Sequence, residues 1–168
     1  GMYGLYPSGE VRADEIPLEP VLSLKTSVVR VKRLPAGEGI SYGTRYFTTG
    51  AETIGTLPIG YADGYSRMLS GKAEVLVRGR RVPVVGTICM DQCMIRLNDA
   101  LEPGDPSVAE GEEVVLIGRQ GDACITAEEV ADRLGTINYE LVCMLAARVP
   151  RLYRSQGEVV AVVNPLLG

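Results

Sequence analysis

Glycine and proline interrupt this chain so often that they restrict it to short elements. Of its 168 residues, 20 are glycine and 10 are proline. Both residues break regular secondary structure, so this composition favours many short strands joined by turns over long helices. The β-rich runs between the breaks recur at intervals of roughly 8–12 residues, as in a barrel or a sandwich. Strands do not alternate with helices along the sequence, which argues against a doubly wound or (β/α)8 fold.

Several runs carry the pattern expected of strands. Residues 21–34 predict a long strand with a bend near Ser27, because Val28 and Val29 break its alternation of apolar and polar positions. Two β-rich runs around Gly79 predict a hairpin. The expected strands after the first cover residues 40–48, 54–59, 73–78, 80–85, 86–98, 114–117, 151–154 and 159–163.

One helix is strongly indicated near the C-terminal end. Thr126 opens a capping box, and Gly135 is placed to end the helix that follows. Residues 139–146 predict a second short helix, with Asn138 as its N-cap. The expected fold class is therefore all-β: a small Greek-key-like β-barrel with a short helical insert near residues 126–146.

Charge and hydropathy argue against two classes of partner. The net charge is −4, and the chain lacks the basic face with interleaved aromatic residues that is typical of nucleic-acid binding. No apolar run reaches the roughly 18 residues needed to span a bilayer, and the start of the sequence does not have the pattern of a signal peptide. We therefore expect a cytoplasmic protein that binds neither nucleic acid nor membranes.

The sequence contains no histidine, and this limits the chemistry that the chain can perform. A Ser/His or Cys/His nucleophile built within this chain is excluded, and so are histidine metal ligands. Acid–base chemistry would fall to Tyr, Lys, Asp, Glu or Cys, or to another chain. Apolar surroundings favour reduced, buried thiols for the four cysteines, Cys89, Cys93, Cys124 and Cys143.

The string from Cys89 to Cys93 contains two thiols but lacks the spacing of a zinc site. Zinc ribbons use two-residue gaps and a second matching pair, which this chain does not supply, so we expect no metal site. The same string places Asp91 and Gln92 inside an otherwise apolar run. Buried polar groups need partners, so this string predicts a site or a structured turn.

Two tyrosines are the candidates for chemistry that the residues alone suggest. Tyr42 lies between Ser41 and Gly43, in an expected strand at the rim of a sheet. Tyr61 lies in a loop flanked by glycines at residues 60–65, where a side chain can contact a ligand. For both, the alternative is a tyrosine that only packs its ring and exposes its hydroxyl.

Six strings, taken together and in order, resemble the C-terminal domain of alanine racemase. The resemblance covers nearly the whole chain, and each string alone is only moderately specific. It implies a pyridoxal-phosphate enzyme of fold type III, with an N-terminal (β/α)8 barrel that holds the cofactor and a C-terminal β domain. It also implies a head-to-tail homodimer in which each active site draws on the β domain of the other subunit. The strings are Ser41-Tyr42-Gly43 with Tyr46, residues 59–64, 86–94, 116–121, 136–140 and 148–151.

The resemblance implies an isomerase of the bacterial cytoplasm that makes D-alanine from L-alanine for cell-wall peptidoglycan. Residues 1–14 would be a remnant of the exit from the last strand of the missing barrel, and residues 15–168 would be the β domain. The second base, which is the cofactor-bearing lysine, and most phosphate contacts would belong to the barrel. We therefore expect this chain alone to be inactive and not to hold the cofactor tightly.

The resemblance also assigns roles at the reacting centre. Tyr42 matches the catalytic tyrosine that exchanges the α-proton on the L-alanine face. Met90 matches the residue whose backbone N–H meets the substrate carboxylate. Asp91 lies beside the substrate position. Tyr61 and Tyr139 match tyrosines that narrow the entrance, and Tyr139 also matches one that reaches the cofactor phosphate.

Three further residues match an outer corridor through which the substrate would enter. They are Arg67, Ile137 and Thr87, and Thr87 stands where many members of the family have arginine. Two alternatives to an alanine racemase stay open: a stand-alone β-barrel module for binding or assembly, and the same domain of a serine or broad-specificity racemase.

Overall fold

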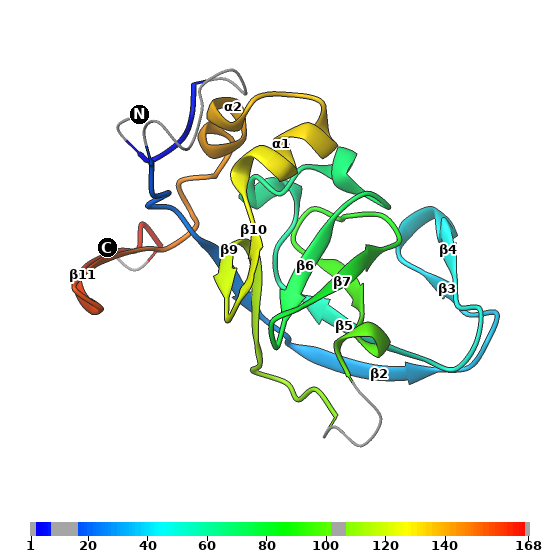
Figure 1. Cartoon of the computed structure of the whole chain (residues 1–168). Coiled ribbons are helices and arrows are strands. Elements are labelled where there is room, and N and C mark those ends of the chain that lie inside the picture. The colour runs from blue at the N-terminus through cyan, green and yellow to red at the C-terminus, as the bar shows by residue number, and fades with distance from the viewer. Residues whose placement is uncertain (1–2, 8–16, 102–106, 167–168) are drawn as a thin grey trace.

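The computed structural model describes residues 3–7, 17–101 and 107–166, and most of this part of the chain is strand or loop (Figure 1). It contains twelve strands, two α-helices and four short 3₁₀ turns. The all-β class predicted from the sequence is therefore confirmed. The expected barrel remnant at residues 1–14 lies largely outside the described residues.

The main sheet follows a Greek-key order. Its strands run β1-β9-β6-β7-β8-β5-β2, every neighbouring pair is antiparallel, and β10 pairs with the far end of β9. Strands β6, β7 and β8 follow one another, and β9 returns beside β6, which is the Greek-key arrangement. The bounds are β1 (Leu24–Ser27), β2 (Arg30–Leu34), β5 (Glu52–Leu57), β6 (Glu74–Val77), β7 (Arg80–Val85), β8 (Cys93–Arg96), β9 (Glu113–Gln120) and β10 (Ala123–Ile125).

The two ends of this sheet are joined by one bend in the chain. Strand β1 pairs with β9 and strand β2 pairs with β5, and the change of partner falls at Val28 and Val29. The N–H of Val28 donates to the carbonyl of Glu112 (3.0 Å), and the N–H of Val29 donates to that of Thr56 (2.9 Å). The predicted bend is confirmed. The predicted barrel is present only as an open sheet, because β1 and β2 are joined through the backbone and not by hydrogen bonds.

The segment predicted as a strand at residues 40–48 is mostly a turn. Only β3 (Gly39–Ile40) and β4 (Tyr46–Phe47) pair there, and a 3₁₀ turn (Tyr42–Thr44) lies between them. Ser41 and Thr44 have positive φ angles of 65° and 40°, which a strand does not allow. The prediction of a continuous strand was therefore wrong, and so was the one for residues 86–98, where only β8 is a strand.

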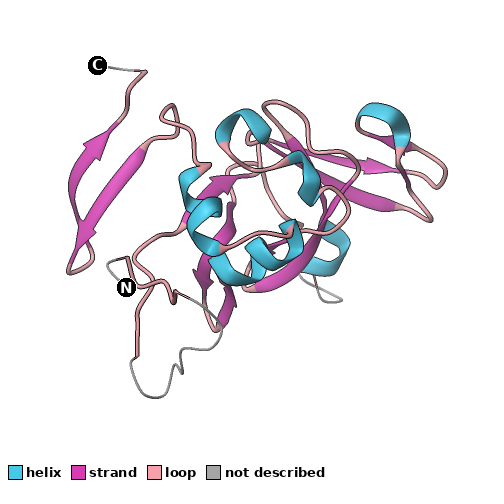
Figure 2. Cartoon of the chain, turned by 90° about the horizontal axis from the view of Figure 1, so that it is seen from above, coloured by secondary structure: helices cyan, strands magenta, loops and turns pink. Residues whose placement is uncertain are grey.

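Helix α1 (Ala127–Leu134) begins and ends where the sequence predicts. The side-chain oxygen of Thr126 accepts a hydrogen bond from the N–H of Glu129 (3.1 Å), and Gly135 ends the helix with φ of 87°. Buried residues of α1 contribute to the same core as the sheet. Figure 2 shows that the helices gather over one end of the sheet.

Helix α2 (Asn138–Cys143) is shorter than predicted and is not capped by Asn138. Ile137 is its N-cap and makes no side-chain capping bond. Asn138 is the first helical residue, and its amide donates to the carbonyl of Tyr6 (3.0 Å) and to Glu128 (2.7 Å). This side chain therefore ties the N-terminal segment to the helices, a tertiary role that the sequence does not indicate.

A single large cluster of buried apolar side chains fills the space between the sheet and the helices. Tyr65 is the largest fully buried side chain in it, and burial raises the pKa of its hydroxyl. Of the four thiols, Cys89 and Cys93 are buried as predicted, whereas Cys143 is exposed. No helix in the described ranges is long and apolar enough to cross a membrane.

The last two strands form a hairpin that stands apart from the main sheet (Figures 1 and 2). Strands β11 (Arg151–Ser155) and β12 (Glu158–Val163) pair with each other and, among the described strands, with no other. Every residue of both strands is exposed, including Leu152, Val160 and Val162. Isolated two-stranded hairpins are only marginally stable in water, so this one needs a surface to pack against.

Four charged side chains connect helix α1 to the β6–β7 hairpin. Arg81 pairs with Glu129 (2.5 Å) and Glu74 (3.3 Å), and Arg133 pairs with the same two carboxylates at 2.8 Å and 2.5 Å. Hydrogen bonds from these arginines lower the pKa of both glutamates below their ordinary value of 4.5. The network therefore stabilises the folded chain while both carboxylates are ionised.

We predict that this network makes the stability depend on acidity. A carboxylate with a lowered folded-state pKa stabilises the fold above its unfolded pKa, and this contribution is lost as the pH falls. Replacing both Glu74→Gln and Glu129→Gln should lower the free energy of unfolding at neutral pH by about 1 kcal/mol and flatten its decline between about pH 6 and pH 3. Urea denaturation across this range measures the effect. A parallel decline in the double variant and in the wild type, with the exposed Glu38→Gln as control, would contradict it.

Candidate functional site

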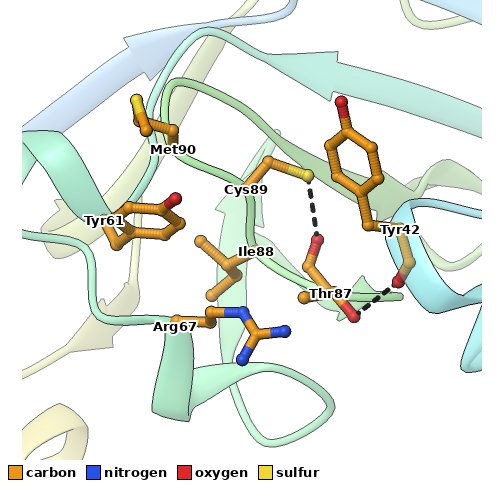
Figure 3. A pocket seen from close by; sticks show the side chains of 7 residues that line it. All are labelled: Tyr42, Tyr61, Arg67, Thr87, Ile88, Cys89 and Met90. Carbon is orange, nitrogen blue, oxygen red and sulfur yellow. Dashed lines mark hydrogen bonds between the residues drawn. The ribbon is translucent and has the colours of Figure 1, made fainter.

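Five of the eight site residues predicted from the sequence line one open cavity of about 470 Å³. Figure 3 shows their side chains around this cavity, together with two residues that the sequence analysis did not assign to the site. The five are Tyr42, Tyr61, Arg67, Thr87 and Met90, and the two additions are Ile88 and Cys89.

Loops, not strands, carry these side chains. Tyr42 lies in the 3₁₀ turn between β3 and β4, and Tyr61 lies in a second 3₁₀ turn (Tyr61–Asp63) that follows β5. Arg67 begins a third such turn (Arg67–Leu69). The rest of the lining belongs to residues 86–92, which join β7 to β8. Binding residues on loops that a rigid sheet positions are the usual arrangement for ligand sites.

Backbone hydrogen bonds fix the Tyr61 loop against the Met90 loop. The N–H of Tyr61 donates to the carbonyl of Cys89, and the N–H of Ala62 donates to that of Met90, both at 3.0 Å. Gly60 allows this approach, because a Cβ at that position would stand 2.2 Å from the Cys89 carbonyl oxygen. The two loops therefore form one unit through their backbones.

Arg148 holds the same two loops together through their carboxylates. Its Nε donates to Asp63 (2.7 Å) and its Nη2 donates to Asp91 (2.5 Å). The other oxygen of Asp63 accepts the N–H of Gly60 (2.9 Å). The hydrogen bond to Asp63, and then the one to Asp91, raise the pKa of Arg148. Asp91 does not line the cavity, and its carboxylate pairs with an arginine to which the sequence analysis assigned no role. Its predicted place beside the substrate stays a prediction.

The two remaining predicted residues lie at helix α2 and do not line the cavity. Ile137 is the N-cap of this helix and is 63% exposed. Tyr139 is partly buried and packs against the main core. Their predicted roles in the corridor and at the cofactor phosphate stay predictions.

The chemistry available in the cavity is that of two phenols and one guanidinium. Tyr42 is 78% exposed and Tyr61 is 42% exposed. Among the described residues that line the cavity, Arg67 is the one with a charged side chain. Phenols donate and accept protons, and a guanidinium binds carboxylates and phosphates. Within the described residues, no group of three or more His, Cys, Asp or Glu side chains is placed to hold a metal ion.

Two signals in the sequence point to the pairing of Arg148 with Asp91. Both residues lie in strings that the resemblance uses, and a carboxylate such as that of Asp91 requires a partner when it lies in an apolar run. The pairing itself joins residues 57 positions apart, so only the fold brings them together. Ile88 and Cys89 carry no such signal beyond their place in the same string.

Comparisons with known proteins identify the family of this chain. The family model described as the C-terminal domain of alanine racemase matches residues 21–153. An alanine racemase of Clostridium novyi is 52% identical over 163 residues, which are 97% of this chain and 41% of that protein. One of Halalkalibacterium halodurans is 53% identical over 169 residues, 99% of this chain and 42% of that protein.

Solved structures of alanine racemases also match nearly the whole of this chain. The alanine racemase of Bacillus anthracis with bound L-Ala-P has a TM-score of 0.90 and 50% identity, over 99% of this chain and 41% of that one. The alanine racemase of Clostridium difficile 630 in complex with cycloserine has a TM-score of 0.86 and 44% identity, over 97% of this chain and 41% of that one. The chain thus spans about two fifths of the length of the relatives it matches.

We predict that Arg148→Met loosens the contact between the two loops. The substitution leaves Asp63 and Asp91 without their shared donor, so the free energy of unfolding should fall. Arg148→Lys should recover only part of this loss, because one ammonium does not present the fork that reaches both carboxylates. Denaturation of the purified protein measures both. Arg45→Met is the control, since it removes an exposed arginine for which the described residues provide no ion pair. Equal stability of the Arg148→Met and Arg45→Met variants would contradict the prediction.

Proposed function

This chain belongs to the alanine racemase C-terminal domain family, and we propose that it serves as that domain in an enzyme that interconverts L- and D-alanine. The observation that carries the proposal is the cavity in which Tyr42, Tyr61, Arg67 and Met90 come together. By the resemblance, Tyr42 and Met90 match the reacting centre, Tyr61 matches the entrance and Arg67 matches the outer corridor. A purely structural module would need none of these hydroxyls.

We propose that the chain works as one part of a longer protein. The relatives are more than twice as long as the matched segment. The hairpin β11–β12 supports the same view, because its exposed apolar side chains have no other strand to pack against in the described part of the chain. The missing part would be a (β/α)8 barrel that meets this domain in a homodimer. The proposed setting is the bacterial cytoplasm, where the D-alanine would supply peptidoglycan.

The residues present fit one side of a pyridoxal-phosphate site. The phenols and Arg67 offer donors to anionic groups, as a phosphate or a substrate carboxylate requires. No lysine lines the cavity, so the residue that would hold the cofactor covalently must come from elsewhere. Tyr139 would reach the cofactor phosphate. When bound, the cofactor withdraws electrons from the α-carbon of the amino acid, which makes its α-proton easier to remove.

In this proposal Tyr42 moves the proton on the L face. Its phenol oxygen forms no hydrogen bond with the described residues. As the phenolate it would take the α-proton from L-alanine, and the hydroxyl so formed would return that proton in the reverse direction. A phenolate requires positive charge nearby to form at neutral pH. Arg67 lines the same cavity, and the barrel would supply further positive charge.

Met90 would orient the substrate through its backbone. It lines the cavity, and its N–H has no protein acceptor among the described residues. An unpaired N–H at the surface of a cavity is a ready donor to a carboxylate. Its neighbour Asp91 is held by Arg148, so this segment is fixed before a substrate arrives. Tyr61 lies on the opposite side of the cavity from Tyr42 and would narrow the entrance (Figure 3).

We predict that Tyr42→Phe abolishes most turnover in the full-length protein. Removing the hydroxyl removes the proton carrier, so kcat should fall by about 10²–10⁴ in both directions. Coupled assays that detect each enantiomer of alanine measure the loss. Tyr3→Phe is the control, because Tyr3 is 63% exposed and does not line the cavity. Wild-type rates in the Tyr42→Phe variant would exclude this tyrosine as the base.

We predict that the 168-residue chain by itself neither binds pyridoxal phosphate tightly nor racemises alanine. The reason is that none of its lysines faces the cavity. Titration of the chain with the cofactor should leave the absorbance spectrum equal to the sum of the two components. A new absorbance band, absent from a control with the Arg67→Met variant, would show that this chain holds a complete cofactor site. That result would overturn the proposal that the cofactor is held mainly by another domain.

A further inference from the structure

The turn that carries Tyr42 has a backbone conformation that its own sequence disfavours. Ser41 has φ of 65° and ψ of 178°, a region that is essentially restricted to glycine. Gly43 and Thr44 also have positive φ, at 72° and 40°. Such a conformation persists only where tertiary contacts impose it. The position of Tyr42 therefore depends on what holds this turn.

Residues 86 and 87 contact the turn and hold it by hydrogen bonds. Thr87 Oγ1 donates a hydrogen bond to the carbonyl of Tyr42 (3.0 Å), and Ser41 Oγ donates to the carbonyl of Thr87 (2.5 Å). The two segments thus exchange one side-chain-to-backbone bond in each direction. They are also in van der Waals contact, because a Cβ on Gly86 would stand 2.9 Å from both the Ile40 carbonyl oxygen and Ser41 Cβ.

The side chain of Thr87 is directed to this turn and not to solvent. Thr87 is only 3% exposed, although it lines the cavity. Figure 3 shows its hydroxyl at the Tyr42 carbonyl and its own carbonyl near Cys89. In the sequence analysis this position belonged to a substrate corridor. A buried hydroxyl whose bond goes to the backbone is better suited to hold a turn than to meet a substrate.

The ring of Tyr42 has no other support among the described residues. It is 78% exposed, and its hydroxyl makes no hydrogen bond with them. The contact that the structure gives for Tyr42 from residues 86–92 is therefore the one to its backbone carbonyl. We propose that Thr87 is a positioning residue that sets the place of the Tyr42 hydroxyl by fixing the carbonyl of the same residue. The inference rests on the proposed function, in which Tyr42 moves the α-proton on the L face.

The test compares Thr87→Val, which keeps the shape and removes the hydroxyl, with Thr87→Ser, which keeps the hydroxyl. Thr56→Val is the control, because Thr56 is a strand residue of β5 outside the cavity. In the full-length protein with its cofactor, Thr87→Val should lower kcat/KM roughly two- to tenfold, the range of one lost hydrogen bond. The factor should be equal in both directions, since the equilibrium between the enantiomers is fixed. Thr87→Ser and Thr56→Val should stay near the wild type.

Isotope effects separate a positioning role from a general loss of structure. If Thr87→Val slows the step of Tyr42, the deuterium isotope effect with α-deuterated L-alanine should rise, because that step then limits the rate more strongly. The effect with α-deuterated D-alanine should fall, because a different base removes that deuteron. Isotope effects that change equally on both sides, or not at all, would overturn the proposal. Equal losses in Thr87→Val and Thr87→Ser would do the same.

Hydrogen exchange gives a readout that does not need activity. The amides of residues 41–45 should exchange faster in Thr87→Val than in the wild type, while Thr87→Ser and Thr56→Val leave them unchanged. Unchanged exchange in Thr87→Val would overturn the proposal that Thr87 holds the turn. If the wild-type protein does not racemise alanine, the proposed function fails. The exchange experiment then decides by itself whether Thr87 positions Tyr42.

Discussion

The backbone groups of residues 86–92 cannot pair in a sheet, and the loops around them satisfy these groups instead. The carbonyl of Thr87 accepts a hydrogen bond from the Ser41 hydroxyl. The carbonyls of Cys89 and Met90 accept from the N–H groups of Tyr61 and Ala62, respectively. The N–H of Ile88 donates to the Ser70 hydroxyl (2.9 Å). Polar backbone groups near a core must find partners, so this loop can be stable only if its neighbours close around it. The requirement brings together the two tyrosines of the proposed site, which lie on separate loops.

The sheet supplies the rigid part of this arrangement. Strands β7 and β8 pair with each other and hold the two ends of the loop, while β5 and β8 pair and place the Tyr61 turn beside it. The core beneath is apolar and continuous with helix α1. The site thus combines fixed strand ends with loops whose conformations depend on one another. Because of this dependence, the hydroxyl of Thr87 on one loop is placed to affect Tyr42 on another.

In the proposed function, the domain contributes one side of a reacting centre and presents it on an open surface. Tyr42 projects from its turn without a side-chain partner among the described residues, and Arg67 is the only charge in the lining. A proton carrier of this kind gains its full function only beside a charged partner that lowers its affinity for the proton. This dependence is consistent with a domain that completes a site built mainly by another, and it agrees with the length of the relatives.

The sequence by itself determined the elements whose signals are local: the all-β class, the bend at Val28 and Val29, the 73–85 hairpin and the first helix. Turn residues, alternation and capping act over a few positions, so they can be read without the fold. The resemblance also identified Tyr42, Tyr61, Arg67, Thr87 and Met90, which the structure brings to one cavity. Only the tertiary structure decided that the sheet stays open, that Tyr42 lies in a strained turn and that Arg148 joins two loops. Those features depend on contacts between residues more than 40 positions apart, and no local pattern encodes them.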